Sequence, residues 1–253
     1  MKNGYQYTQA ATTLTPALVV YLIDASQSMN DRCGSTTRID VVNMALKNAI
    51  KDMARRSMRD GVIQRRYKIA IFVYSTKVID VLDGICDLPE LVRAGVPILR
   101  AGGQTDMAAG FAAVEQLLEA HMAEFQRCPA PLVCHLTDAQ FTARDPSSII
   151  QRIQGLRVND GPVLVENIYV ADNMLRKPVQ DWYEWSGVLH TRQLTNAYAK
   201  LLFYLSSPLP ESYRQNINNY DYHLQPGTSL FFPGTHTDLL RLAFAISAAT
   251  QLK

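Results

Sequence analysis

The sequence predicts an α/β fold with a doubly wound, mostly parallel sheet, one antiparallel edge strand and helices on both faces. Two observations predict it. Continuous apolar runs, typical of strands buried on both faces, alternate with stretches in which apolar residues recur at helical spacing. The composition agrees, because 253 residues with 47% hydrophobic and 19% charged side chains can bury a sizeable core. It also excludes a disordered, collagen-like or disulfide-rich chain.

The first predicted strand is the apolar run 17–23, which stops at Asp24. This run is too short for the core of a signal peptide or for a membrane span, which needs about 20 apolar residues. Segment 78–86 follows an apolar run after a short turn, so we expect a hairpin and an antiparallel edge strand there. The other predicted strands are 68–74, 131–136 and 163–170.

Apolar residues at helical spacing predict helices between these strands, over 39–53, 106–126 and 146–156. After Asp172 the pattern loosens. We interpret 1–253 as a single domain with an insertion at 173–227 packed on it, because this connection is long for an α/β fold. The elements expected in this part are a helix over 193–205, an irregular loop over 208–226, a short strand over 229–232 and a terminal helix over 238–252.

The formal net charge of +2 gives no overall attraction to nucleic acid or to an anionic membrane. The four cysteines lie at no zinc-like spacing, so we interpret them as free thiols in a reducing compartment. With no recognisable signal peptide, we expect a cytoplasmic protein that binds neither membrane nor nucleic acid. The cysteines are Cys33, Cys86, Cys128 and Cys134.

Polar residues stand where three predicted segments reach one edge of the sheet. Asp24, Ser26 and Ser28 follow the first strand, Thr105 precedes the second helix in a Gly-Gly-Gln-Thr loop, and Asp138 follows strand 131–136. In an open parallel sheet, ligands bind beyond the carboxyl ends of the strands. Carboxylate and hydroxyl oxygens suit a hard divalent cation, so we expect Mg²⁺, with Mn²⁺ and Ca²⁺ as alternatives. Two carboxylates neutralise such an ion and leave it able to accept one more from outside.

In this order, the residues resemble the metal-ion-dependent adhesion site of von Willebrand factor A (vWA) domains: D-x-S-x-S, a threonine in a later loop, then an aspartate after a strand. The resemblance covers 17–172 and, more loosely, 229–252. It implies that Ser26, Ser28 and Thr105 contact the cation directly, and that Asp24 and Asp138 bind it directly or through water.

Two features depart from the family pattern. The final aspartate is usually followed by glycine, whereas this chain has Ala139. Residues 30–37 lengthen the loop after Met29, on the same face as the predicted cation. Both departures leave the five predicted ligands intact, so they bear on the shape of the ligand-binding surface.

The resemblance implies a binding module rather than an enzyme, in which an Asp or Glu of a protein partner completes the coordination of the cation. The chain looks like the stand-alone intracellular vWA proteins of bacteria. These are associated with AAA-type ATPases, or with protein kinases and protein phosphatases in stress or phage-defence systems. We therefore expect an adaptor or scaffold in such a set.

A Mg²⁺-dependent phosphohydrolase is one alternative, because an aspartate at the end of a first strand also describes haloacid-dehalogenase-type enzymes. Those enzymes need a second aspartate two residues later, where this chain has Ser26. The sequence also has no Gly-rich phosphate loop with Lys and Thr and no G-x-S-x-G motif.

A nucleic-acid-associated module is the other alternative, through the Arg-rich stretch 51–68, which has seven Lys and Arg against Asp52 and Asp60. This stretch could bind phosphate or an acidic partner, but a solvated helix end that complements the negative end of the helix dipole fits it better. The histidines show no zinc-like spacing, and we interpret them as structural or surface residues. Aromatic residues of the insertion leave two readings open, a partner surface or attachment to the sheet: Trp182, Trp185, Tyr213, Tyr220 and Tyr222.

Overall fold

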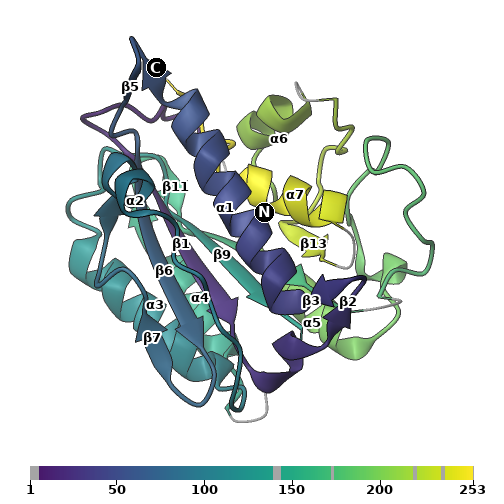
Figure 1. The fold of residues 1–253 in the computed structure, drawn as a ribbon. Helices are drawn as coiled ribbons and strands as arrows, with labels where there is room; N and C mark the ends of the chain where they lie inside the picture. The colour runs from purple at the N-terminus through teal and green to yellow at the C-terminus, as the bar shows by residue number, and fades with distance from the viewer. Residues whose placement is uncertain (1–5, 139–143, 172–173, 219–220, 235–236, 253) are drawn as a thin grey trace.

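The computed structural model describes residues 6–138, 144–171, 174–218, 221–234 and 237–252. A seven-stranded sheet forms the centre of this part of the chain (Figure 1), in the order β13-β12-β9-β1-β6-β7, with β8 also paired to β6. All pairs from β13 to β6 are parallel, and β7 and β8 run antiparallel to β6. The predicted sheet with one antiparallel edge is thus confirmed. Its strands are β1 (Ala17–Asp24), β6 (Tyr67–Tyr74), β7 (Val78–Asp80), β8 (Cys86–Asp87), β9 (Leu132–Thr137), β12 (Leu164–Tyr169) and β13 (Phe231–Pro233).

Helices cover both faces of the sheet. In Figure 1, α1 and α7 pack against each other on the near face, and α3 and α4 pack against each other behind it. The remaining elements are short helices and two-stranded hairpins. The helices are α1 (Arg38–Arg56), α2 (Leu88–Ala94), α3 (Met107–His121), α4 (Ser147–Gly155), α5 (Ala197–Tyr204), α6 (Glu211–Asn218) and α7 (Thr237–Ile246), with 3₁₀ turns η1 (Gln27–Asn30) and η2 (Thr191–Gln193). The hairpins pair β2 (Arg32–Cys33) with β3 (Thr36–Thr37), β4 (Met58–Arg59) with β5 (Val62–Ile63), and β10 (Arg157–Val158) with β11 (Gly161–Pro162).

The start of α1 is set by a capping box. The Thr37 hydroxyl accepts a hydrogen bond from the Asp40 amide, and the Asp40 carboxylate accepts one from the Thr37 amide. These reciprocal bonds satisfy amides that a helix terminus otherwise leaves unpaired. A buried stripe that includes Ile39, Val42 and Leu46 then holds the helix on the sheet. The helix therefore begins directly after the residues that lengthen the loop beyond Met29.

Strand β1 is buried along its whole length between β6 and β9. Its register pairs Asp24 with Tyr74 of β6 and Ile23 with Leu136 of β9. Because these strands are parallel, their carboxyl ends lie at the same edge of the sheet. This edge is where the sequence places its polar residues.

Several predicted boundaries differ from the structure. Helix α3 ends at His121 rather than at 126, and the chain continues in turns to the buried Phe125. Helix α7 ends at Ile246 rather than at 252, and the chain continues in turns in which the Ala248 and Ala249 amides donate to the Ala245 and Ile246 carbonyls. The predicted irregular loop 208–226 contains a helix, α6, which buries Tyr213 and Ile217.

The aromatic residues of 174–227 do two different things. Trp185 packs edge-on against Phe232 of β13, and the buried Tyr213 hydroxyl hydrogen-bonds to Thr250, so both attach this part of the chain to the rest. Tyr183 and Tyr222 instead stack on each other near the surface, and the Tyr183 side chain is half exposed. Tyr220 lies outside the described residues.

Two further features bear on the sequence analysis. All four cysteines are unpaired thiols. None of the helices within the described ranges combines the length and the apolar character that crossing a membrane requires.

Candidate metal centre

Asp24 is the last residue of β1 and is fully buried. Its Oδ1 accepts a hydrogen bond from the Ser26 amide at 2.8 Å, and its Oδ2 accepts one from the Thr137 hydroxyl at 2.8 Å. Burial raises the pKa of Asp24, and the negative charge of Asp138 adds to this, while the hydrogen bonds from Ser26 and Thr137 lower it. A carboxylate in this position is held firmly in place but is short of compensating positive charge.

Ser26 and Ser28 carry this cluster from Asp24 to Asp138. The turn η1 starts after Ser26 and places the hydroxyl oxygens of the two serines 3.1 Å apart. The Ser28 hydroxyl donates a hydrogen bond to Asp138 Oδ1 at 2.8 Å. The alternation of D-x-S-x-S therefore turns both hydroxyls toward the two carboxylates.

Thr105 reaches the same edge through its loop. The Gly102 amide donates to the Ala25 carbonyl at 2.8 Å, and the Gln27 amide donates to the Gly103 carbonyl at 2.9 Å. Gly103 has a φ of +90°, and a Cβ atom there would lie 2.6 Å from the Thr76 hydroxyl oxygen. Only glycine fits such a position without strain, so this residue allows the close approach of the Thr105 loop to Ser75 and Thr76 in the turn after β6. Thr105 itself is 6% exposed.

Asp138 follows β9 and completes the cluster, with an unexpected neighbour. Its side chain is 0% exposed, and its Oδ2 lies 2.6 Å from Nη1 of Arg38, the first residue of α1. The same nitrogen lies 3.4 Å from the Ser28 carbonyl oxygen and 3.4 Å from Asp31 Oδ2. The structure thus joins Asp24, Ser26, Ser28 and Asp138 by hydrogen bonds, and brings Thr105 to their edge on a bonded loop.

Sequence reasoning did not single out Arg38. One signal was present: an arginine at the start of a helix faces the positive end of the helix dipole, which is unfavourable unless an acid compensates it. The hairpin of β2 and β3 brings it to the site, because the Arg38 amide donates to the Asp31 carbonyl at 3.0 Å. The other departure that the sequence shows, Ala139, lies outside the described residues.

The donor atoms of this cluster are all oxygen. In the part of the chain that the structure describes, no three His, Cys, Asp or Glu side chains gather as a metal-binding group. A zinc-type site built from nitrogen and sulfur is therefore not what these residues offer. Two carboxylates and neighbouring hydroxyls fit a hard cation such as Mg²⁺, which takes one or two carboxylates and completes its shell with other oxygens. A cation bound here would compensate the buried negative charge of the Asp24 carboxylate.

His135 lies in β9 near this edge but belongs to the core. Its Nε2 is 2.9 Å from the Tyr74 hydroxyl, and its Nδ1 is 2.8 Å from Oδ1 of Asn167. Burial lowers the pKa of His135 to about 4, against which the hydrogen bond to Asn167 acts weakly. The imidazole is neutral at physiological pH, and both of its nitrogens are engaged within the core.

Residues 19–140 match the sequence profile of the von Willebrand factor type A domain, and this range contains all five predicted ligands. This part of the chain is similar to vWA domains. Domains of this kind commonly mediate protein–protein interactions. No curated protein sequence matches the chain.

Three solved structures are similar to this chain to different degrees. The PilB minor pilin from Streptococcus sanguinis matches with a TM-score of 0.53 and 12% identity, over 91% of this chain and 60% of the pilin. The SpRpn10 VWA domain matches with a TM-score of 0.45 and 11% identity, over 62% of this chain and 76% of that domain. Proximal thread matrix protein 1 from the mussel byssus, with a zinc-occupied MIDAS motif, matches with a TM-score of 0.44 and 15% identity, over 63% of this chain and 37% of that protein. At 12% identity, the likeness to the PilB minor pilin concerns the fold alone.

Proposed function

We propose that this chain is a metal-dependent protein-interaction module whose cation is held by Asp24, Ser26, Ser28, Thr105 and Asp138. The observation that carries the proposal is the continuous hydrogen-bonded cluster from Asp24 through the two serines to Asp138 at the carboxyl edge of the sheet. The vWA fold of 19–140 supports it, because domains with this fold commonly act in protein–protein interactions.

The surroundings of the cluster suit a partner that supplies a carboxylate. Asp24 and the Asp138 side chain are buried, whereas Gln27, Asn30 and Gln104 around them are exposed. A divalent cation at the cluster would be neutralised by the two aspartates and would retain coordination positions toward solvent. An Asp or Glu side chain of a protein partner can fill such a position, so that recognition depends on the metal.

The proposal includes a role without catalysis. Ser26 occupies the place where a phosphohydrolase of the haloacid-dehalogenase type needs an acid–base aspartate, and its hydroxyl hydrogen-bonds to Ser28. The partner classes expected from the sequence, an AAA-type ATPase, a protein kinase or a protein phosphatase, belong to the proposal. So do the cytoplasmic location and the interpretation of 173–227 as an insertion in a single domain of 1–253.

Direct metal titration tests the proposal. Wild-type protein freed of metal with a chelator is titrated with Mg²⁺ and Mn²⁺ by calorimetry, beside Asp24→Asn and Ser28→Ala. Asp60→Asn is the matched control, because Asp60 is a 94% exposed aspartate in the β4–β5 turn with a positive φ that asparagine also adopts. We expect binding in the wild type and the control, and loss in the two site variants. Equal binding in all four proteins would contradict the proposal.

Partner capture provides the second arm of this test. The tagged chain is used to isolate proteins from its native extract in Mg²⁺ and in chelator, with the same variants. Partners lost both in chelator and in Asp24→Asn, and retained by Asp60→Asn, support metal-bridged recognition. Partners that persist in every condition contradict it.

A further inference from the structure

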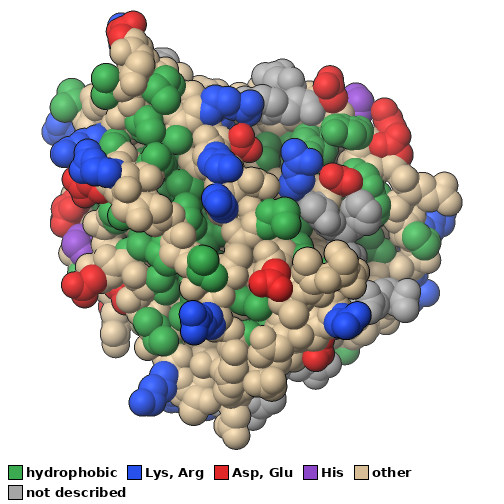
Figure 2. All heavy atoms as spheres, in the orientation of Figure 1, with side chains coloured by type: hydrophobic (Ala, Val, Ile, Leu, Met, Phe, Trp, Pro, Cys, Tyr) green, Lys and Arg blue, Asp and Glu red, His purple; other side chains and the backbone are tan. Residues whose placement is uncertain are grey.

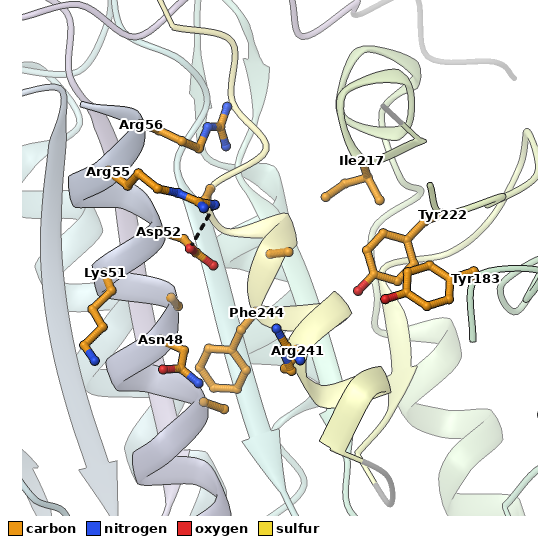
Figure 3. Close-up of a pocket in the computed structure, with 14 residues that line it drawn as sticks. Asn48, Lys51, Asp52, Arg55, Arg56, Tyr183, Ile217, Tyr222, Arg241 and Phe244 are labelled. Carbon is orange, nitrogen blue, oxygen red and sulfur yellow. Dashed lines mark ion pairs between the residues drawn. The ribbon is translucent and has the colours of Figure 1, made fainter. Parts of the chain in front are cut away.

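A cavity lies in the groove between α1 and α7, separate from the metal cluster. It has a volume of about 380 Å³ and is bounded by α1, α7, the end of α6 and the stacked Tyr183 and Tyr222 (Figure 3). None of the residues proposed to hold the cation contributes to its lining. Its size falls in the range of small-molecule sites, which is about 300–1,000 Å³.

Cationic side chains dominate one side of this cavity. Four basic residues line it against a single acid, Asp52. Figure 2 shows Lys and Arg side chains gathered over the C-terminal half of α1 and beside α7. In Figure 3, Arg55 and Arg56 extend from α1 toward the side where the tyrosines stand. The basic residues are Lys51, Arg55, Arg56 and Arg241.

These arginines are only partly neutralised by their neighbours. Arg55 lies 3.2 Å from Asp52, and Arg241 lies 3.8 Å from Asp238. Both guanidinium groups are largely exposed, with side chains 74% and 64% accessible. Arg56 donates one hydrogen bond to the Thr250 carbonyl, which fixes the position of its guanidinium. Donors therefore remain available to an anion that enters the cavity.

The other side of the cavity is aromatic and apolar. The rings of Tyr183 and Tyr222 stack with centroids 5.2 Å apart at 25°, and both hydroxyls point into the cavity toward Arg241 (Figure 3). Burial raises the pKa of Tyr222, so its hydroxyl is protonated and can donate a hydrogen bond at neutral pH. Phe244 and Ile217 are buried apolar residues of the lining. The cavity thus offers charge on one side and flat apolar surface on the other.

The Arg-rich stretch of the sequence is divided by the fold. Arg55 and Arg56 line the cavity, whereas Arg65 pairs with Asp87 and Glu90 at 3.4 Å and Arg59 lies against Asp60. A continuous basic track, which a nucleic-acid backbone needs, is therefore not formed by this stretch. The charge is gathered instead at one bounded cavity, which suits a compact anion.

From these observations we propose that the cavity between α1 and α7 binds a small organic phosphate, with the phosphate held by Arg55, Arg56 and Arg241 and a flat ring against Tyr183 and Tyr222. Guanidinium groups present paired donors that match phosphate oxygens, and such charge-assisted hydrogen bonds are about twice as strong as neutral ones. The tyrosine hydroxyls add donors, and the ring stack supplies the apolar contact. Binding at this cavity is independent of the cation.

Adenosine monophosphate (AMP) is the probe that tests this site, by calorimetry and by amide chemical shifts on the full chain. Arg241→Gln is compared with Arg65→Gln, whose arginine has the same 64% side-chain exposure but lies outside the cavity. We expect AMP to bind to the wild type. Its affinity should be about tenfold lower in Arg241→Gln, a loss of about 1.4 kcal/mol, and unchanged in Arg65→Gln. Binding should persist in chelator.

A second variant separates the ring from the phosphate. Tyr222→Leu should weaken the binding of AMP. It should leave unchanged the binding of inorganic phosphate, which is weaker in the wild type. Three results would overturn the proposal: no AMP binding at millimolar concentration, equal loss in Arg241→Gln and Arg65→Gln, or equal affinities for AMP and ribose 5-phosphate. Far-ultraviolet circular dichroism of each variant shows that a loss of binding is not a loss of fold.

Discussion

Nη1 of Arg38 lies 2.6 Å from Oδ2 of Asp138, 100 positions away in the sequence, at the carboxyl edge of the sheet where the polar cluster lies. The guanidinium supplies a positive charge to a carboxylate whose side chain is fully inaccessible. A divalent cation bound by Asp138 would supply the same compensation. The Arg38 guanidinium and the cation therefore compete for the Asp138 carboxylate.

Removal of Arg38 should strengthen cation binding. In Arg38→Gln we expect the affinity for Mg²⁺ or Mn²⁺ to rise by about tenfold, because one fixed positive charge beside the ligand aspartate is gone. Arg152→Gln is the control, since Arg152 also pairs with a carboxylate, that of Glu115, but lies outside the cluster. An unchanged or lower affinity in Arg38→Gln, measured by calorimetry, would show that the arginine does not oppose the cation.

The same substitution should strengthen cation binding but lower the stability of the protein when no metal is bound. Without metal, Arg38→Gln leaves Asp138 without a cationic partner, and we expect the free energy of unfolding to fall by about 1–3 kcal/mol. Saturating Mg²⁺ should restore much of this loss. Denaturant unfolding in chelator and in Mg²⁺ measures both values, and a deficit that Mg²⁺ leaves untouched would contradict the prediction.

Gly103→Ala tests the loop that carries Thr105. The φ of +90° and the 2.6 Å approach of an added Cβ to the Thr76 hydroxyl oxygen oppose any side chain here. We expect a loss of about 1–3 kcal/mol in the free energy of unfolding and weaker cation binding. Gly155→Ala in α4 is the control, because nothing lies within 4 Å of its Cβ position. Similar effects in the two variants would indicate that the loop tolerates a side chain.

Glu166 should make stability fall at alkaline pH. This fully buried residue of β12 has its pKa raised by burial from 4.5 to about 8, with Cys134 beside it acting weakly in the opposite direction. Between these values the folded chain holds a proton that the unfolded chain releases. The contribution to stability is therefore full below pH 4.5 and is lost as the pH rises to about 8.

The measurement is the free energy of unfolding across this pH range for the wild type, Glu166→Gln and the exposed control Glu119→Gln. We expect a decline with rising pH in the wild type and in the control, and a flatter profile in Glu166→Gln. The comparison uses the slopes, so it holds even where the substitution changes the absolute stability. Parallel profiles in all three proteins would show that Glu166 does not bind this proton.

His135 should make stability fall at acid pH. Its pKa is lowered from 6.5 to about 4, so the unfolded chain binds a proton that the folded chain rejects. Stability is lost as the pH falls from 6.5 toward 4. Proton NMR of the imidazole in the folded protein measures this value directly, and a titration near 6.5 would contradict it.

The strands and the polar edge were predictable from sequence because both depend on local patterns. The continuous apolar run that becomes β1 marks a strand buried on both faces, and Asp24 marks its end. Helix α6 was not predictable in the same way, because its apolar Tyr213 and Ile217 stand within a strongly polar segment. Its helical conformation is stabilised by packing on α7, which no local pattern expresses.

The pair of Arg38 and Asp138 was hidden for a related reason. It depends on a two-stranded hairpin that turns the loop after Met29 back toward the sheet, and on parallel strands that bring β9 beside β1. The cavity between α1 and α7 likewise combines arginines of these two helices with tyrosines that are 39 positions apart in the chain. Such arrangements depend on tertiary structure, whereas the D-x-S-x-S motif spans five consecutive residues and can be recognised in the sequence.

The most direct test of the central claim is a crystal of the chain soaked in Mn²⁺ and measured for anomalous scattering. The account predicts a peak bound by hydroxyl oxygens of Ser26, Ser28 and Thr105, with Asp24 and Asp138 bound directly or through water. Arg38 should then lie farther from Asp138 than 2.6 Å. A crystal with no peak at this cluster, and Arg38 still paired with Asp138, would contradict the account.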